Sequence, residues 1–225
     1  MIAERIRHIE KRMADACVRA GRDPQDVALV AVTKTQSPET INEALRAGLT
    51  DIGENRVQEL LGKKDDLQPH RMHMIGHLQR NKVKNLIGDV VMIHSVDSVA
   101  LAAEIGRRSE AANCTTDILL EVNTSGEESK FGFAPDALQN AAQEIFRIPN
   151  VRLRGLMTVA AFVDDAETVR PAFRQLRQLR DELAAAYPDA PLTELSMGMT
   201  NDFEVAIEEG ATLVRIGSAI FGPRS

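Results

Sequence analysis

Cysteine is scarce in this 225-residue chain, and the two that occur, Cys17 and Cys114, lie far apart in the sequence. Neither belongs to a CxxC pair. A disulfide framework or a zinc site needs several cysteines at short, regular spacings, so the sequence predicts neither of them. Such sparse cysteine usage is typical of a protein from a reducing compartment.

Excess positive charge and long apolar runs are also missing. The 27 Lys and Arg residues are outnumbered by 33 Asp and Glu residues, which gives a formal net charge of -6. A nucleic-acid surface needs clustered cations in excess, so we expect no nucleic-acid partner. No apolar run approaches the roughly 20 residues that cross a bilayer, and charges interrupt the N-terminus, unlike a signal peptide. We therefore expect a cytoplasmic protein with no membrane partner.

The chain does contain a regular alternation of apolar and amphipathic segments. Apolar residues recur at helical spacing from Ile2 to Cys17, which predicts an N-terminal helix that ends near Gly21. Short apolar runs typical of buried strands follow at residues 27–32, 51–55, 72–77, 90–96, 117–123, 151–159, 192–198 and 212–220. Helical patterns lie between them, for example at residues 38–48, 98–112, 135–146 and 166–187.

Alternating strands and helices predict an α/β fold with a parallel sheet. Eight predicted strands, in a chain close to the typical ~250 residues, favour a closed (β/α)8 TIM barrel. We expect residues 1–225 to form this barrel as a single domain with an extra N-terminal helix. An open doubly wound sheet is the alternative, but no GxGxxG motif follows the first strand, where a dinucleotide-binding fold needs one.

Polar residues stand at the ends of most predicted strands. Lys34 follows the apolar run "VALVAV", although lysine is among the residues least often buried. In such barrels the C-terminal strand ends converge on one mouth, where active sites lie. Asn55, after the second strand, either belongs to such a site or caps the next helix, and we favour the site. For His94, Ser95 and Thr158 we expect ordinary structural roles, such as a bond from His94 to a neighbouring carbonyl.

Small residues form turns after the last two predicted strands, at Ser196–Gly198 and at Gly217–Ser218. Barrels often bind a phosphate between these two loops, against the N-terminus of a short helix. Ser196, Thr200 and Ser218 would supply hydroxyl donors, and Gly217 would let the backbone come close to the anion. The sequence therefore predicts a phosphate site here.

A lysine and a phosphate site at one barrel mouth suggest a phosphorylated aldehyde as the ligand. A lysine amine attacks a carbonyl only when it is neutral, and its ordinary pKa of about 10.4 opposes this near pH 7. Apolar surroundings and a nearby Arg215 would favour the neutral amine. The product is a Schiff base, which is also the usual attachment of pyridoxal phosphate.

The chain resembles the pyridoxal phosphate homeostasis protein family over essentially its whole length. The matching stretches are "AVTKTQSPETI", "GENRVQEL", "MHMIGHLQRNKVK", "HSVDS", "LLEVNTSGEESKFGF", "LRGLMTV" and "LSMGMTNDFEVAIEEGATLVRIGSAIFG". The resemblance implies a barrel like the N-terminal domain of alanine racemase, with pyridoxal phosphate covalently held on Lys34.

The resemblance also implies the surroundings of the cofactor. The phosphate would be bound by Ser196, Gly217 and Ser218, and Arg215 would face the pyridine nitrogen. Asn55 and Thr200 match family residues near the cofactor. No metal ligand is implied.

The same resemblance bears on whether the chain is an enzyme. A racemase needs acid/base groups on both faces of the substrate carbanion, and in alanine racemase-like enzymes the second is a tyrosine from another domain of the partner subunit. The single tyrosine here, Tyr187, follows a long predicted helix, away from the strand ends. An arginine opposite the ring nitrogen also discourages protonation of that nitrogen. We therefore expect a non-catalytic protein that buffers or delivers pyridoxal phosphate inside the cell.

Two alternatives stay open. The chain could be a pyridoxal phosphate-dependent amino-acid racemase of the fold type III kind that uses His77 or Asp202 as a base, and a weak residual racemase activity is compatible with the carrier prediction. It could also be a Schiff-base aldolase that binds a phosphorylated sugar and no cofactor. For the carrier we expect a monomer, because no second domain follows the predicted barrel, and pyridoxal phosphate-dependent enzymes are the candidate recipients.

Overall fold

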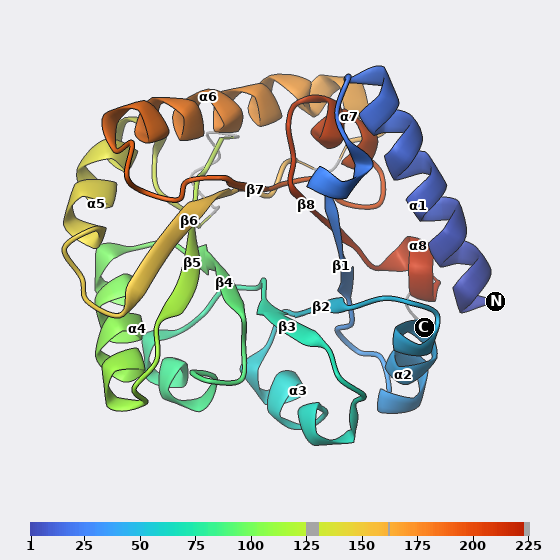
Figure 1. Ribbon diagram of the computed structural model, residues 1–225, viewed down its shortest axis with the longest axis horizontal. Helices are drawn as coiled ribbons and strands as arrows, with labels where there is room; N and C mark the ends of the chain where they lie inside the picture. Colours follow the sequence, from blue (N-terminus) through green and yellow to red (C-terminus); the bar gives the residue numbers. More distant parts are fainter. Residues whose placement is uncertain (125–130, 162, 223–225) are drawn as a thin grey trace.

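The computed structural model describes residues 1–124, 131–161 and 163–222. Within these residues eight parallel strands close a barrel in sequence order, and β1 pairs with β8 (Figure 1). The strands are β1 (Ala28–Val32), β2 (Asp51–Glu54), β3 (Arg71–Met74), β4 (Met92–Val96), β5 (Thr116–Glu121), β6 (Val151–Met157), β7 (Glu194–Ser196) and β8 (Leu213–Ile216). The predicted (β/α)8 barrel is confirmed.

Helices surround the strands, as Figure 1 shows. They are α1 (Ile2–Arg19), α2 (Pro38–Arg46), α3 (Val57–Leu61), α4 (Val99–Ala111), α5 (Leu138–Ile145), α6 (Arg170–Ala186), α7 (Phe203–Glu208) and α8 (Ser218–Phe221). Single 3-10 turns lie at Pro24–Asp26, Lys64–Asp66, Arg80–Asn85, Pro135–Ala137 and Ala166–Val169. The predicted N-terminal helix is α1, which lies beside α7 and α8.

Six of the eight predicted strands extend past the end of the observed strand, two of them by three residues or more. The run 72–77 is a strand only as far as Met74. In the run 212–220 the strand ends at Ile216, and Ser218 begins the short helix α8. Both runs carry apolar residues past the end of the strand, Ile75 in the first and Ala219 and Ile220 in the second, and such residues do not distinguish a strand from the turn or helix that continues it.

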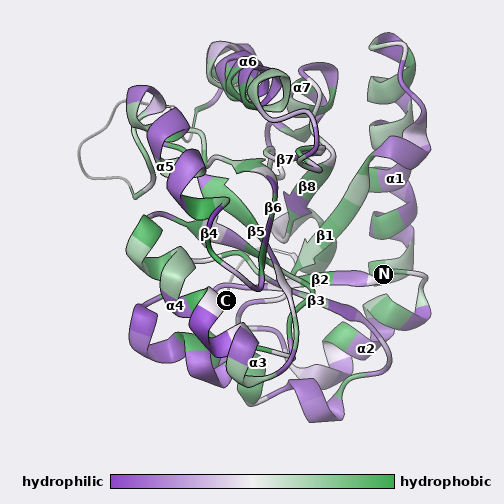
Figure 2. Cartoon of the chain, turned by 60° about the vertical axis from the view of Figure 1, so that its left-hand side comes forward, coloured by the Kyte–Doolittle hydropathy of each residue, from purple (hydrophilic) through white to green (hydrophobic). Residues whose placement is uncertain are grey.

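Apolar side chains fill two layers of the barrel. The larger lies between the strands and the helices, whose apolar faces point inward while polar residues face outward (Figure 2). The smaller fills the barrel interior with Val30, Leu119, Met157 and Leu213. Successive residues of a strand point to opposite faces, so Val30 and Val32 share the inward face of β1. Lys34 continues that alternation at the barrel mouth.

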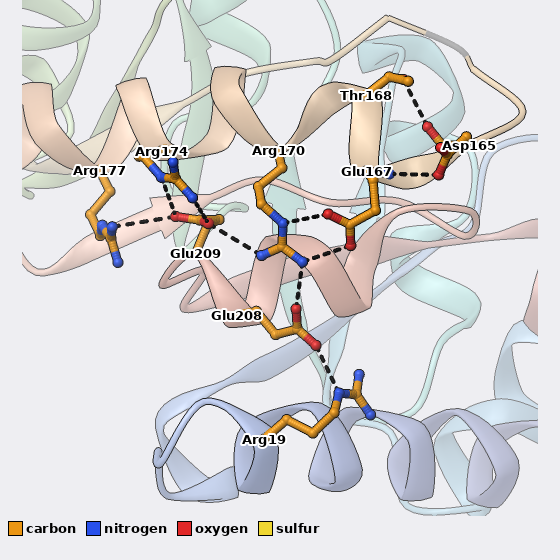
Figure 3. Close-up of polar contacts among 9 residues, drawn as sticks. All are labelled: Arg19, Asp165, Glu167, Thr168, Arg170, Arg174, Arg177, Glu208 and Glu209. Atoms are coloured by element: carbon orange, nitrogen blue, oxygen red, sulfur yellow. Dashed lines mark hydrogen bonds and ion pairs between the residues drawn. The ribbon is translucent and has the colours of Figure 1, made fainter.

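A ladder of ion pairs holds α1 and α6 onto α7 (Figure 3). Glu208 accepts from Arg19 at 2.8 Å and from Arg170 at 2.6 Å. Glu209, which is 5% exposed, lies within 3.3 Å of Arg170, Arg174 and Arg177. Because α7 follows the turn after β7, the ladder fixes an element next to the barrel mouth.

Of the helices within the described ranges, none combines the length and the apolar character that crossing a bilayer requires.

Candidate functional site

A cavity of about 280 Å³ opens at the C-terminal ends of β1, β7 and β8. This volume lies near the lower end of the range of about 300–1,000 Å³ that is typical of small-ligand pockets. Its lining includes Val32, Lys34, Thr200, Asp202, Arg215, Gly217 and Ser218. Larger hollows lie elsewhere, for example along α4, but that one is more open to solvent and shares no lining residue with this cavity.

Lys34 and the Gly217–Ser218 turn are neighbours because β1 pairs with β8. In the register of this pair Val30 is opposite Arg215, so the chain after Val32 runs beside Gly217. A Cβ atom on Gly217 would lie 3.2 Å from both Cβ and the carbonyl oxygen of Val32. Glycine therefore allows a close approach of the two strand ends, and both line one cavity.

Hydroxyl groups meet on the wall of this cavity next to Lys34. Ser218 begins α8 directly after Gly217, and its Oγ donates to Thr200 Oγ1 at 3.1 Å. Thr200 comes from the turn after β7. The two loops that the sequence predicts to bind phosphate thus meet at the cavity, and they supply Thr200, Gly217 and Ser218.

Arg215 is 4% exposed, lines the cavity and makes its hydrogen bonds inside the barrel. It donates through Nη1 to Ser196 Oγ at 2.5 Å and through Nη2 to the carbonyl oxygen of Thr158 at 2.8 Å. Burial lowers the pKa of its guanidinium to about 10, although Asp202 and Glu121 oppose this shift. Arg215 therefore stays cationic at neutral pH.

A chain of buried hydrogen bonds continues from Arg215 across the barrel interior. Ser196 Oγ lies 2.8 Å from His94 Nδ1, His94 Nε2 lies 2.9 Å from His73 Nδ1, and His73 Nε2 lies 2.8 Å from Asp51 Oδ1. All five side chains are buried. The chain crosses from β8 at the mouth to the first residue of β2 at the opposite end of the barrel.

Asp51 and His94 have strongly shifted pKa values. Burial tends to raise the pKa of the Asp51 carboxyl, but hydrogen bonds from His73, Arg71 and Thr50 outweigh burial and hold it far below its usual value. Burial lowers the pKa of His94 well below 6.5, and the neighbouring His73 and Arg215 lower it further. Asp51 is therefore an anion and His94 is neutral near pH 7.

One arrangement of protons gives every donor in this chain an acceptor. The ionised Asp51 can only accept, so His73 carries a proton on Nε2. The neutral His94 donates from Nε2–H to His73 Nδ1, and its Nδ1 accepts the Ser196 hydroxyl proton. Ser196 Oγ then accepts from Arg215. All donors point from the cavity towards Asp51.

Five of the seven predicted site residues line the cavity: Lys34, Thr200, Arg215, Gly217 and Ser218. Ser196 does not line it, because its side chain is fully buried beneath Arg215. Asn55 is also outside the lining. It does not cap α3, whose N-cap is Arg56. Its Oδ1 is buried without a hydrogen-bond partner among the described residues, and it shares the inward alternation of Asp51.

The two residues considered as alternative bases differ in position. His77 lies outside the cavity lining. Its Nδ1 is 3.2 Å from Asp97 Oδ2, and its ring stacks on the ring of Phe131. Asp202 lines the cavity, and its Oδ1 accepts the backbone N–H of Met199 at 2.5 Å. Burial raises the pKa of Asp202. Asp202 thus closes the 199–202 turn at the edge of the cavity.

Ordinary structural roles hold for Ser95, which donates to the carbonyl of Gly76, and for Thr158, which donates to the carbonyl of Val122. For His94 the expected bond to a neighbouring carbonyl is wrong, because the ring bonds the side chains of His73 and Ser196.

Tyr187 lies far from the cavity, as expected. It packs on Phe146 and lines a hollow with Val151, at the beginning of β6. Residues 125–130 of the "LLEVNTSGEESKFGF" stretch lie outside the described residues.

Comparison with known sequences identifies the family of this chain. The alanine racemase N-terminal domain family matches residues 6–225. A pyridoxal phosphate homeostasis protein from Aquifex aeolicus is 48% identical over 223 residues, which cover 98% of this chain and 97% of that protein. Another from Pseudomonas aeruginosa is 42% identical over 225 residues, covering 99% of this chain and 96% of that protein. The chain belongs to the pyridoxal phosphate homeostasis protein family.

Solved structures agree with this assignment. A similar fold is seen in PipY from Synechococcus elongatus, which was solved with pyridoxal phosphate bound. It is 35% identical, with a TM-score of 0.85 that covers 99% of this chain and 100% of that one. An alanine racemase from Clostridium difficile has a TM-score of 0.74 at 12% identity, covering 98% of this chain and 57% of that one. This second likeness shows that the homeostasis family and the racemase share the barrel fold.

The buried chain predicts a specific protonation state for His94. Nitrogen-15 NMR of the ring should show a neutral imidazole with its proton on Nε2, from pH 7 down to pH 5. Since the pKa of His94 is lowered in the fold, the unfolded chain takes up a proton that the folded chain does not as the pH falls below 6.5. His94 should therefore reduce stability by about 1.4 kcal/mol per pH unit in that range.

His8, on the exposed face of α1, is the internal control in the same spectra. A proton on Nδ1 of His94 at pH 7, or a charged ring at pH 6, would contradict the arrangement.

Proposed function

We propose that this chain binds pyridoxal phosphate as a Schiff base on Lys34 and buffers or delivers the cofactor, without robust turnover of amino acids. The observation that carries the proposal is that Lys34 lines the same cavity as Thr200, Gly217, Ser218 and Arg215. Two findings on relatives support it. Proteins up to 48% identical are named pyridoxal phosphate homeostasis proteins, and PipY was solved with the cofactor bound.

The residues of the cavity fit the chemical groups of this cofactor. The aldehyde needs an amine, which Lys34 offers. The phosphate needs hydrogen-bond donors, and the hydroxyls of Thr200 and Ser218 and the backbone N–H groups beside Gly217 are such donors. When bound, the cofactor supplies an aldehyde that condenses with amines and a ring that withdraws electrons from the attached carbon.

Three further residues would act around the ring. The Arg215 guanidinium donates hydrogen bonds to Ser196 and to the Thr158 carbonyl inside the barrel. Because a guanidinium has no acceptor atom, it can only donate towards the cavity. A ring nitrogen of the cofactor beside it would therefore act as an acceptor. Ser196 would act through Arg215, by holding its Nη1, and would not contact the phosphate through its hydroxyl. The buried Oδ1 of Asn55, unpartnered among the described residues, can accept a hydrogen bond from a group at the mouth.

A carrier role without catalysis is supported by the shortage of proton-transfer groups. Among the described residues that line the cavity, the side chains that titrate are Lys34, Asp202 and Arg215. The Asp202 carboxylate accepts a backbone N–H, and Arg215 stays charged. A racemase that uses Asp202 as its second acid/base group is the remaining alternative, because Asp202 is in the cavity and His77 is outside its lining.

Several wider features belong to the same proposal. We propose that residues 1–225 form one domain, which the single closed barrel supports. We also propose that the protein is a cytoplasmic monomer, that it needs no metal, and that its partners are the cofactor and the pyridoxal phosphate-dependent enzymes that receive it. Nucleic acids and membranes are not proposed as partners.

The covalent site is tested by borohydride reduction and peptide mass spectrometry. After incubation with pyridoxal phosphate, wild-type protein should carry one pyridoxyl phosphate group on Lys34, and the Lys34→Ala variant none. Lys84→Ala, a change at an exposed lysine, is the matched control and should label like wild type. Before reduction, protein that has bound the cofactor should absorb near the visible range. A sugar aldolase without the cofactor would show no such absorbance. Labelling spread over surface lysines, or equal labelling of Lys34→Ala, would refute the site.

The absence of turnover is tested by exchange of α-protons in deuterated water. Loaded protein incubated with a panel of amino acids should show exchange close to that of free pyridoxal phosphate, since Asp202, the candidate second acid/base group in the cavity, is held by the backbone N–H of Met199. Rapid exchange that is lost in Lys34→Ala would establish an enzyme. Loss in Asp202→Asn as well would identify the base of the racemase alternative.

A further inference from the structure

A second lysine, Lys63, lies buried next to the loop that carries Lys34. Its side chain is 11% exposed, and it follows α3 on the outside of the barrel mouth. The ammonium donates to the carbonyl oxygen of Thr33 at 2.9 Å and to Glu54 Oε1 at 2.8 Å. It also lies 3.5 Å from Glu59 Oε2. A lysine ammonium has three N–H donors, and three oxygens lie within 3.5 Å of the Lys63 Nζ atom.

The carboxylates of Glu54 and Glu59 accept hydrogen bonds from the residues on both sides of Lys34. Thr33 Oγ1 donates to Glu54 Oε1 at 2.7 Å, and the backbone N–H of Thr35 donates to Glu59 Oε2 at 2.8 Å. With the bond from Lys63 to the Thr33 carbonyl, the residue before Lys34 and the residue after it are tied to one ionic cluster, which consists of Glu54, Glu59 and Lys63.

The backbone conformation in this loop is one that needs such support. Thr35 has a φ of 64°, in the left-handed region that a β-branched residue rarely adopts. A conformation of this kind persists only where surrounding contacts over-determine it. The bond from Thr35 N–H to Glu59 is such a contact, and it sets the direction in which the chain leaves Lys34.

Stability alone is a weak reason for burying these ions. The Glu54 side chain is fully buried, and its Oε2 has no hydrogen-bond partner among the described residues. Replacing a buried ion pair by apolar residues of similar size is often neutral or stabilising, because desolvation offsets the attraction. What the ions add here is geometry, since their hydrogen bonds end on the segment from Thr33 to Thr35 or on one another, and the one further ion pair is a 3.8 Å contact between Glu59 and the exposed Arg56.

We propose that Lys63, with Glu54 and Glu59, is a positioning cluster that holds the Lys34 amine at the cavity in the orientation needed for attack on the cofactor aldehyde. The inference rests on the proposed function of Lys34. None of the three residues lines the cavity, so the cluster acts through the backbone of Thr33 and Thr35. Misplacing a reacting group by about 1 Å can slow a reaction by about 100-fold.

The test compares Lys63→Met with the matched control Lys64→Met. Lys64 is the next residue. Its Nζ lies 2.8 Å from Asp89 Oδ1, and this ion pair does not involve the Lys34 loop. Two rates are measured well below the unfolding midpoint of each variant. One is the attachment of pyridoxal phosphate, followed by absorbance, and the other is the competitive acetylation of Lys34 in protein free of cofactor. For Lys63→Met we expect cofactor attachment to slow by about 10- to 100-fold and acetylation of Lys34 to change, with Lys64→Met at wild-type rates.

Glu59→Ala is the second variant, because Lys63→Met removes the partner of a buried carboxylate and can unfold the protein. The Glu59 side chain is 23% exposed, and alanine is compatible with helix α3. It removes the acceptor of Thr35 N–H, and we expect a slowing of about tenfold in cofactor attachment.

A merely structural cluster would lower the unfolding midpoint of these variants and leave both rates at the wild-type value, which would overturn the inference. That outcome differs from a failure of the proposed function, in which wild-type protein itself would not attach the cofactor at Lys34.

Discussion

Closure of the barrel between its first and last strands is the contact on which the candidate site depends. The pairing of β1 with β8 brings Lys34, from one end of the chain, beside the Gly217–Ser218 turn, from the other. Val32 at the end of β1, Lys34 two residues beyond it, Arg215 on β8 and Gly217 directly after β8 all line the same cavity. An amine, a cation and a group of hydroxyls are thereby held together without a flexible element between them.

The barrel interior is adapted to this site at a cost in stability. Interiors of such barrels are usually filled by branched apolar side chains, and here Val30, Leu119, Met157 and Leu213 follow that rule. On the other side of the interior lie Asp51, His73, His94, Ser196 and Arg215. Apolar residues of the same size would often be as stable or more so. The polar chain instead holds the Arg215 cation between neutral partners, and the carboxyl groups of Asp202 and Glu121 favour its charged form.

Much of this arrangement follows from local patterns in the sequence, and part of it does not. The order of the strands and the cavity positions of Lys34, Thr200, Arg215, Gly217 and Ser218 follow from alternation and from turn residues at strand ends. The contacts of Ser196, His73 and Lys63 do not, because they join elements whose relative height depends on the stagger of the closed barrel. A signal was nevertheless present, since His73 and His94 interrupt apolar strands and Lys63 follows an apolar helix, where each needs a buried partner.

The central claim is that one cavity holds both the reactive amine and the phosphate of the cofactor. A crystal structure of the protein after addition of pyridoxal phosphate tests it most directly. We expect continuous density from Lys34 Nζ to the aldehyde carbon, the phosphate against Thr200, Gly217 and Ser218, and the ring nitrogen facing Arg215. Cofactor joined to another lysine, or a phosphate bound outside the turns after β7 and β8, would contradict it.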